Sequence, residues 1–373
     1  MSAERVLITG GAGFIGSHLA DHLLARGHRV RALDSLVPQV HGESGTRPSY
    51  LHPDVELLTG DVRDPVVVRR ALTGVDSVVH LAARVGVGQS MYQIAEYVSA
   101  NDMGSAVLLE AIAAHPVRRL VTASSMSVYG EGLYADPAGN PVEHAERGLE
   151  SLRRGEWEVT DSGGSPLRPV PTPETKRPAL SSVYALTKYD QERLALLIGS
   201  AYGVPSIALR LFNVYGTRQA LSNPYTGVLA IFAARLLNGK PPVVFEDGLQ
   251  RRDFVHVADV ARAIRLALEA PETVSGVFNV GSGASVTVLE IAGRLAEALG
   301  RTGPDPEITG QYRVGDIRHC FADITKAREV LGYEPETPMD RGLEDLARWL
   351  EREQASDLVS EAREELATRG LTF

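Results

Sequence analysis

Short apolar runs alternate with helix-like segments through the first half of the chain. β-branched residues dominate the runs at 6–9, 29–33, 55–58, 77–81 and 119–122, and the segments between them carry apolar residues at helical spacing. Strands buried on both faces have this composition, because helices cover each side of a parallel sheet. The alternation therefore predicts an α/β fold, a doubly wound parallel sheet of the Rossmann type.

The pattern changes at residue 131. From there to 178, Gly, Pro, Ser and charged residues dominate, which predicts an inserted surface segment with one short helix near 143–154. Surface decoration is favoured over a lid as its role. The core resumes with a helix expected at 181–201 and a strand at 206–210, and the charged stretch 352–369 predicts a solvated terminal helix.

Five parts follow from these changes of pattern. Most of the Rossmann core precedes the insert, and a smaller mixed α/β part follows it, with some segments returning to the sheet. The expected boundaries are 1–130 for the first part of the core, 131–178 for the insert, 179–215 for the rest of the core, 216–352 for the smaller part and 353–373 for a charged tail.

The composition narrows the class of protein. The 373 residues are 44% hydrophobic and 23% charged, as in an ordinary globular chain that buries a large core. A net charge of −9 and the lack of dense Lys/Arg runs argue against a nucleic-acid partner. No apolar run is long enough for a membrane span, and the stretch at 6–9 passes straight into glycines, which leaves no room for a signal peptide.

Three residues with reactive side chains are expected to be structural. The single cysteine, Cys320, excludes disulfides within the chain and cysteine-rich zinc sites, so we expect a small buried core residue and no metal. A cytoplasmic location fits this cysteine usage. His80 and His256 both stand in apolar, strand-like runs, where a buried structural histidine is the expected role.

Three glycines after the first strand predict a dinucleotide site. Gly10, Gly13 and Gly16 form a GxxGxxG pattern that opens a helix, where glycine permits a tight turn and lets backbone amides approach a pyrophosphate. Asp34 closes the second strand near the spacing at which a carboxylate meets the adenosine ribose. That carboxylate would repel a 2′-phosphate, so the sequence favours NAD over NADP.

Tyr184 and Lys188 are candidates for acid–base chemistry, because their spacing of four places them on one face of the expected helix. A phenol has a pKa near ~10, which must fall by about 3 units for the group to act as a base near neutrality. A neighbouring ammonium and the positive charge of a nicotinamide can lower it. Ser124 and Ser125 follow the fifth strand, where a hydroxyl can hydrogen-bond the reacting oxygen.

Several motifs together resemble one family. They lie at 10–16, 80–83, 124–130, 184–188, 210–216 and 252–260. With them the chain resembles the extended short-chain dehydrogenase/reductases, in particular the NAD-dependent nucleotide-sugar epimerases. The resemblance covers nearly the whole chain apart from the insert and the tail. It implies a core at 1–130 that binds NAD and a part at 216–352 that binds a nucleotide-diphosphate sugar.

The resemblance also implies roles for single residues. Tyr184 matches the family's base, Lys188 its ribose-binding lysine and Ser125 the hydroxyl on the sugar's C4 oxygen, while Asn101 supports the site from the helix beneath. The expected cofactor-binding residues are Gly10, Gly13, Phe14, Ile15, Gly16, Asp34, Asp61, Val62, Leu81, Ala82, Ala83, Asn101, Ser124, Tyr184 and Lys188. The expected substrate-binding residues are Arg84, Ser125, Met126, Asn213, Arg252, Arg313 and Asp316. A plain loop role for Asp61 stays open.

Within the family, the residues after Ser125 decide the expected reaction. Dehydratases carry an Asp-Glu pair and decarboxylating relatives a glutamate there, whereas this chain has Met126 and Ser127. Without these acidic residues, the reaction left within the family is oxidation and re-reduction at one carbon. The resemblance therefore implies a 4-epimerase that works through a transient 4-keto sugar. The stretches 213–228 and 315–319, with the insert, look most like the dTDP-L-rhamnose 4-epimerases.

Several alternatives stay open. UDP-glucose and UDP-glucuronate are alternative substrates, because Arg84 or Arg218 can still meet a carboxylate, although Ala220 stands where glucuronate enzymes carry an arginine. A 4-ketoreductase or dehydrogenase would release NADH or need NADPH. A non-catalytic NAD sensor is a different class, which often lacks the tyrosine or lysine kept here. Relatives commonly dimerise through helices at 91–114 and 181–201, so a homodimer is expected.

Overall fold

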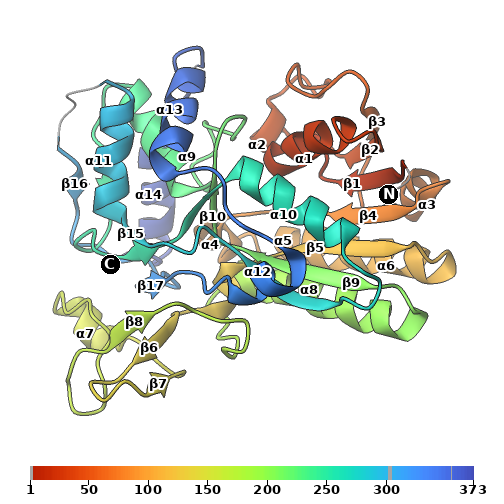
Figure 1. Cartoon of the computed structure of the whole chain (residues 1–373). Coiled ribbons are helices and arrows are strands. Elements are labelled where there is room, and N and C mark those ends of the chain that lie inside the picture. The colour runs from red at the N-terminus through yellow and green to blue at the C-terminus, as the bar shows by residue number, and fades with distance from the viewer. Residues whose placement is uncertain (1–2, 301–304, 354) are drawn as a thin grey trace.

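The computed structural model describes residues 3–300, 305–353 and 355–373. Its centre is a seven-stranded parallel sheet in the order β14-β9-β5-β4-β1-β2-β3 (Figure 1). The strands are β1 (Arg5–Thr9), β2 (Arg29–Asp34), β3 (Glu56–Thr59), β4 (Ser77–His80), β5 (Arg119–Ser125), β9 (Ser206–Leu211) and β14 (Gly276–Val280). Each expected strand overlaps one of these, and the doubly wound Rossmann-type sheet is confirmed.

Helices cover both faces of this sheet. α1 (Phe14–Leu24) packs against α10 (Val257–Glu269) in one layer, and α6 (Gly104–Ala114) packs between α3 (Pro65–Leu72) and α8 (Val183–Tyr202) in the other. The two layers bury separate hydrophobic clusters against the strands. Both faces of the sheet are therefore shielded from solvent, as the near-continuous apolar runs predict.

The remaining elements of this region are short. They are α2 (Pro38–His41), α4 (Val87–Ser90), α5 (Ile94–Tyr97), a π-helical turn (Val98–Met103) and a 3-10 turn (Met126–Tyr129). α5 and the π-helical turn run directly into α6, so that residues 94–114 form a continuous helical segment beside α8. Among the described residues, no helix has the length and apolarity that a membrane crossing requires.

A third hydrophobic cluster lies in the smaller C-terminal part. α9 (Val228–Leu237), α11 (Val288–Ala298) and α13 (Met339–Leu350) surround it (Figure 1). Short strands border these helices, namely β10 (Asn213–Tyr215), β11 (Val243–Val244), β12 (Arg251–Arg252), β13 (Phe254–His256), β15 (Val286–Thr287), β16 (Glu307–Ile308) and β17 (His319–Cys320). α10, β14 and α12 (Thr325–Leu331) pack in the hydrophobic cluster of the Rossmann core.

The insert is a folded unit of its own. β6 (Leu133–Ala135) pairs with β7 (Pro141–Val142) and β8 (Arg168–Val170) in an antiparallel sheet, and α7 (Leu149–Arg153) falls within the short helix expected there. Tyr134 is the largest side chain of its small buried core. The periodicity faded in the sequence because strands of two or three residues are too short to show alternation.

Buried ion pairs fasten the insert to the C-terminal part. Arg147 pairs with Glu131 at 3.0 Å and with Glu246 at 2.6 Å. Arg318, whose side chain is 1% exposed, pairs with Glu158 of the insert and with Glu246 of the C-terminal part, the latter at 3.0 Å. Buried charges cost free energy unless they are paired, so these contacts hold one arrangement of the insert. The prediction that the insert only decorates the surface is therefore incomplete, because the insert is also bound to the C-terminal part by these ion pairs.

The charged tail forms α14 (Val359–Thr368), so the terminal helix is present. The expectation that it is solvated is wrong for one face, because Val359, Ala362 and Leu366 are buried. The spacing of three and four places these side chains on one stripe of the helix. Cys320 is buried and unpaired, as expected.

The network around Arg318 gives a test of how the insert is held. Arg318→Met should lower the free energy of unfolding by about 3–5 kcal/mol, because it leaves buried carboxylates without their partner. Urea denaturation measures this loss. Arg154→Met is the matched control, since Arg154 pairs with Glu156 on the surface and its removal should leave the midpoint unchanged. An unchanged midpoint for Arg318→Met would contradict the assigned role of the network.

Candidate active site

The glycine turn after β1 is so tight that Gly10 and Gly16 of the predicted motif have no room for a side chain. Gly10 has φ +69°, and a Cβ there would lie 2.9 Å from the backbone nitrogen of Ala82. A Cβ on Gly16 would lie 2.4 Å from the carbonyl oxygen of Gly10. At Gly13 the nearest atom would be 3.3 Å away, so packing alone does not demand glycine at this position.

Asp34 ties the glycine turn to the end of β2. Its carboxylate accepts hydrogen bonds from the amides of Ala12 at 3.0 Å and Leu36 at 2.9 Å. His41 lies 3.5 Å from the same carboxylate. Asp34 therefore sits on the wall of the cleft, with its negative charge held in place by the backbone.

The residues expected to hold the cofactor surround one cleft of about 350 Å³. Those that line it are Gly10, Gly13, Phe14, Ile15, Gly16, Asp34, Asp61, Val62, Leu81, Ala82, Ala83, Ser124, Tyr184 and Lys188. Asn101 does not line it. Its amide oxygen accepts from the Arg84 amide at 2.7 Å, and its nitrogen donates to Thr187 at 2.9 Å, so it supports the wall from behind.

Two of these residues have their polar groups engaged within the protein. Asp61 pairs with Arg63 at 2.6 Å, and hydrogen bonding to Arg63 holds the pKa of Asp61 below its usual value. The hydroxyl of Ser124 donates to Glu192 at 2.7 Å, and Glu192 pairs with Arg210 at 2.7 Å. Ser124 therefore belongs to a buried network beneath the cleft, and nothing in the sequence pattern had singled out Glu192.

Ser125 and Tyr184 come together at the mouth of the cleft. Ser125 ends β5, and its hydroxyl accepts from the amide of Ser127 at 3.1 Å. Tyr184 lies in the first turn of α8, where its amide donates to Ser90 at 3.0 Å. Burial raises the pKa of the Tyr184 phenol, and hydrogen bonding with Ser125 opposes that rise. The expected lowering of this pKa is thus not provided by the chain's own Lys188.

Lys188 points into a buried polar network. Its ammonium donates to the Gln191 side chain at 2.7 Å, and Gln191 donates to Ser105 at 2.9 Å. Burial lowers the pKa of Lys188 to about 7, against the raising effects of Glu192 and Asp102. Gln191 is not among the residues expected at the site, although its spacing of three from Lys188 places the two on one helix face.

The two histidines are structural, as expected. His80 is buried between Thr9 at 2.7 Å and Ser105 at 2.9 Å. Burial and the nearby Lys188 lower its pKa to about 3, so it is neutral and serves the network as a hydrogen-bonding group. The His256 ring accepts from the amide of Ala258 at 3.3 Å and so caps α10.

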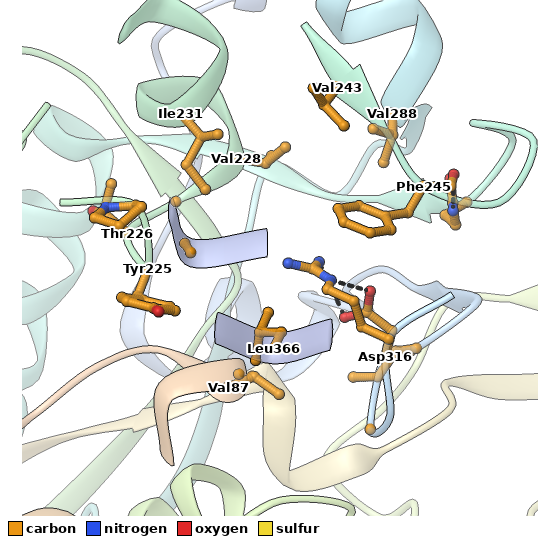
Figure 2. A pocket seen from close by; sticks show the side chains of 18 of the residues that line it. Val87, Tyr225, Thr226, Val228, Ile231, Val243, Phe245, Val288, Asp316 and Leu366 are labelled. Atoms are coloured by element: carbon orange, nitrogen blue, oxygen red, sulfur yellow. Dashed lines mark hydrogen bonds and ion pairs between the residues drawn. The ribbon is translucent and has the colours of Figure 1, made fainter. Parts of the chain in front are cut away.

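The residues expected to bind substrate lie mainly in a second pocket of about 270 Å³, shown in Figure 2. Met126, Asn213, Arg252, Arg313 and Asp316 line it. Arg313 stacks 4.6 Å from the centre of the Phe245 ring and donates to Asp316 at 2.8 Å. Arg252 donates to the carbonyl of Arg318 at 2.8 Å. Both guanidinium groups are thus held in place by the chain itself.

Arg84 lies elsewhere than expected. It lines the cofactor cleft and is absent from the lining of the second pocket. Its guanidinium donates to Gln39 at 3.2 Å and lies 3.6 Å from Glu96. Assignment of Arg84 to the substrate is therefore not supported by its position.

A third cavity of about 240 Å³ joins the other two. It shares Ser125 and Tyr184 with the cofactor cleft, and Met126 and Asn213 with the second pocket. A long ligand in the second pocket would therefore place its end at the Ser125 and Tyr184 hydroxyls, against the cleft. Such an arrangement suits proton and hydride transfer at one carbon atom.

Across the cofactor cleft, the loop 216–227 reaches back to the first part of the core. The Gln39 side chain donates to Asn223 at 3.0 Å, and Arg218 pairs with Asp21 at 2.8 Å. Asn223 itself lines the cleft. These contacts of the loop 216–227 join residues nearly two hundred positions apart, and no sequence pattern indicated them.

The fold and this site define a dinucleotide-dependent enzyme of the Rossmann class with a second ligand pocket beside the cofactor cleft. Residues 6–148 and 160–281 match the NAD dependent epimerase/dehydratase family, and the chain belongs to that family. The resemblance to NAD-dependent epimerases, and NAD as cofactor, are thereby confirmed.

Individual relatives match along nearly their whole length. A dTDP-L-rhamnose 4-epimerase of Burkholderia thailandensis is 35% identical over 95% of this chain and 96% of its own. A UDP-glucose 4-epimerase of Thermotoga maritima, solved with UDP-glucose, superposes with a TM-score of 0.75 at 31% identity over 93% of this chain and 99% of its own. A UDP-glucose 4-epimerase of Thermus thermophilus, solved with NAD, superposes with a TM-score of 0.72 at 32% identity, over 93% of this chain and 99% of its own.

The tight turn gives a first prediction for the site. Gly16→Ala should destabilise the fold by ~1–3 kcal/mol and lower the NAD content of the purified protein, because its Cβ would collide with the Gly10 carbonyl. Thermal unfolding and absorbance of bound cofactor measure both effects. Gly293→Ala in α11 is the control, since no atom lies within 4 Å there and alanine should stabilise the helix. Unchanged melting and cofactor content for Gly16→Ala would refute the steric argument.

The buried ammonium gives a prediction with a pH dependence. The pKa of Lys188 is lowered from 10.5 to about 7, so folding disfavours its charged form. The destabilisation is full below pH 7 and fades as the pH rises toward 10.5. Lys188→Met should therefore raise the melting temperature of the cofactor-free protein by several degrees, and by more at pH 6 than at pH 9.

Differential scanning fluorimetry at both pH values measures this gain. Lys240→Met is the control, because Lys240 is half exposed and pairs with Asp357 at the surface. Its melting temperature should show no such difference between the two pH values. A Lys188→Met protein that melts at or below the parent temperature at pH 6 would show that the ammonium is not a destabilising group.

Proposed function

We propose that this protein is an NAD-dependent nucleotide-sugar 4-epimerase that acts on a neutral hexose, dTDP-L-rhamnose or a related sugar. The observation that carries the proposal is a third cavity that meets the cofactor cleft at Ser125 and Tyr184 and meets the second pocket at Met126 and Asn213. One cavity has the residues expected around NAD, and the other two together accommodate a nucleotide and a sugar. The family match and the relatives' activities support the same reaction.

In this mechanism Tyr184 removes the proton of the sugar's C4 hydroxyl, and Ser125 holds the C4 oxygen by a hydrogen bond. When bound, NAD supplies the hydride acceptor and a positive charge that lowers the phenol's pKa. Lys188, fixed by Gln191, is placed to bind the ribose hydroxyls from the floor of the cleft. The resulting 4-keto sugar turns about its diphosphate link, and Tyr184 returns the proton after hydride delivery to the opposite face.

In this proposal the third cavity, of about 240 Å³, holds the sugar. The residues that line this sugar cavity support epimerisation over the family's other reactions. Met126 and Ser127 stand beside Ser125, and none of the described lining residues is acidic. Elimination of water needs an acid and a base near the sugar, beyond the one tyrosine. A dehydratase is therefore disfavoured. A non-catalytic NAD sensor is disfavoured because Tyr184 and Lys188 both line the cleft.

The same lining supports a neutral sugar. None of its described residues carries a positive charge. Arg84 is engaged with Gln39 and Glu96, and Arg218 pairs with Asp21. A uronate carboxylate in this cavity would be desolvated without a partner, which costs several kcal/mol. UDP-glucuronate is thus disfavoured as substrate, and UDP-glucose remains the alternative to dTDP-L-rhamnose.

A homodimer in the cytoplasm is part of the proposal. Val98 and Met103 are 42% and 57% exposed on the helical segment 94–114, and Leu186 and Leu197 are 44% and 56% exposed on the neighbouring α8. Apolar side chains gathered on two adjacent helices suit a four-helix interface with a second copy. The unpaired thiol of Cys320 suits a reducing compartment.

The reaction is tested by incubating the protein with NAD and a panel of sugar nucleotides. dTDP-L-rhamnose, UDP-glucose, UDP-glucuronate and UDP-N-acetylglucosamine are the panel, and proton NMR follows the configuration at C4. We expect inversion of dTDP-L-rhamnose or of a related neutral sugar without net NADH, and no turnover of UDP-glucuronate. NADH or a 4-keto product that accumulates without inversion would move the assignment to a dehydrogenase.

Tyr184→Phe tests the assigned base. Loss of the phenol should lower kcat by about 10²-fold or more while NAD remains bound, because the variant lacks only one oxygen atom. Tyr202→Phe is the matched control, since Tyr202 is 52% exposed at the far end of the same helix and its variant should keep full activity. Tyr184→Phe with parental kcat would mean that another group removes the proton.

The oligomeric state is tested by light scattering after size-exclusion chromatography. The parent protein should run as a dimer, and the double variant Met103→Glu, Leu197→Glu should run as a monomer, because charges would be buried in the proposed interface. Leu149→Glu is the control, since Leu149 is 47% exposed on the insert. A monomeric parent protein would refute the proposed dimer.

A further inference from the structure

The C-terminal helix α14 forms part of the second pocket. Val359, Ala362, Arg363 and Leu366 line it together with Arg313. In Figure 2, Leu366 projects from its helix into the same space as Val87 and Ile231. The contact with the core is close, since a Cβ at Gly88 would lie 3.4 Å from the Leu366 side chain.

Two arginines, one in this helix and one directly after it, contact the neighbouring parts of the protein. Arg363 donates to Glu307 at 3.2 Å and to Gln311 at 3.3 Å. Arg369 lies 4.5 Å from the centre of the Tyr92 ring, and Tyr92 in turn hydrogen-bonds Tyr225 at 2.7 Å. These contacts join α14 to both sides of the pocket, while its apolar stripe faces inward. The helix is therefore oriented by its polar edges.

Both ends of the segment are anchored. Before the helix, Lys240 pairs with Asp357 at 2.8 Å, and the Asn238 side chain donates to the carbonyl of Ala355 at 2.8 Å. After it, the backbone of Phe373 exchanges hydrogen bonds with Tyr312 at 2.9 and 3.0 Å.

The end of the tail also supports the loop that carries Arg313. The amide of Val314 donates to the carbonyl of Leu371 at 3.0 Å, on the other side of Arg313 from Tyr312. The rings of Tyr312 and Phe373 stack with centres 5.4 Å apart. The tail thus pairs antiparallel with residues 312–314 and holds the loop of Arg313 and Asp316.

We propose that residues 359–373 are a substrate-binding element, with α14 as an apolar wall of the nucleotide-sugar pocket and the last residues as a clamp on the Arg313 loop. This rests on the proposed function, which places a nucleoside diphosphate in that pocket. The wall lies outside the cofactor cleft, since no residue of the segment is among the cleft's described lining residues. The segment therefore acts on the affinity for the nucleotide sugar and leaves that for NAD unchanged.

A truncated chain that ends at Leu358 tests the proposal by isothermal titration with dTDP and with UDP as probes. The full-length protein should bind at least one of them. The truncated protein should bind it at least ten-fold more weakly and retain its NAD content and its far-ultraviolet circular dichroism. Equal affinities in the two proteins, or no binding of either probe by the full-length protein, would overturn the proposal.

Two point variants test the same proposal without removing the helix, in case the truncated chain does not fold. Leu366→Glu places a charge on the wall, whereas Ala367→Glu places it on the neighbouring exposed position of the same helix. Only Leu366→Glu should weaken dTDP or UDP binding and raise the KM for the sugar nucleotide by ten-fold or more, with the smaller change in kcat. Equal effects of the two variants would overturn the proposal.

The outcomes also separate this proposal from the proposed function. If the full-length protein binds dTDP or UDP and Leu366→Glu weakens that binding, the wall is established even when no sugar on the panel is inverted. In that case only the 4-epimerase assignment fails. If sugars are inverted while truncation and Leu366→Glu leave affinity and KM unchanged, the function stands and the wall is refuted.

Discussion

The parallel sheet is covered by helices on both faces, and this constraint decides where polar chemistry can occur in the protein. Unpaired polar groups are costly between two apolar layers. The strand ends are the exception. Thr9, His80 and Ser125 close β1, β4 and β5, which are neighbours in the sheet, so their polar groups meet at one edge. The cofactor cleft and the hydroxyls of Ser125 and Tyr184 both lie along that edge.

The charges beneath this edge are compensated to different degrees. Glu192 pairs with Arg210 and also accepts from Ser124, so both charges are satisfied inside the protein. Lys188 donates to the neutral Gln191, and no described carboxylate forms an ion pair with it. Burial lowers the pKa of Lys188, and the nearby carboxylates of Glu192 and Asp102 offset only part of that shift. The fold thus holds one buried ammonium without an ion-pair partner among the described residues, which costs stability.

The loop at 312–319 is held from two sides by segments that seemed peripheral. From the insert, Arg147 donates to the carbonyl of Asp316 at 2.8 Å, and Glu131 accepts from the amide of Arg318 at 2.8 Å. From the tail, residues 371–373 pair with the loop along its other edge. Arg313 and Asp316 can therefore be held in one geometry before a substrate arrives, which lowers the entropy lost on binding.

The sequence by itself determined the alternation of strands and helices typical of a Rossmann fold, the glycine turn and the Tyr184–Lys188 pair, because each depends on residues close together in the chain whose spacing shows directly in the pattern. Only the tertiary structure decided that Ser124 faces Glu192, that Arg84 lies in the cofactor cleft, and that α14 lines the second pocket. These contacts join residues tens to hundreds of positions apart. Periodicity shows that a helix has an apolar face, but the surface which that face covers is settled only when the whole chain has packed.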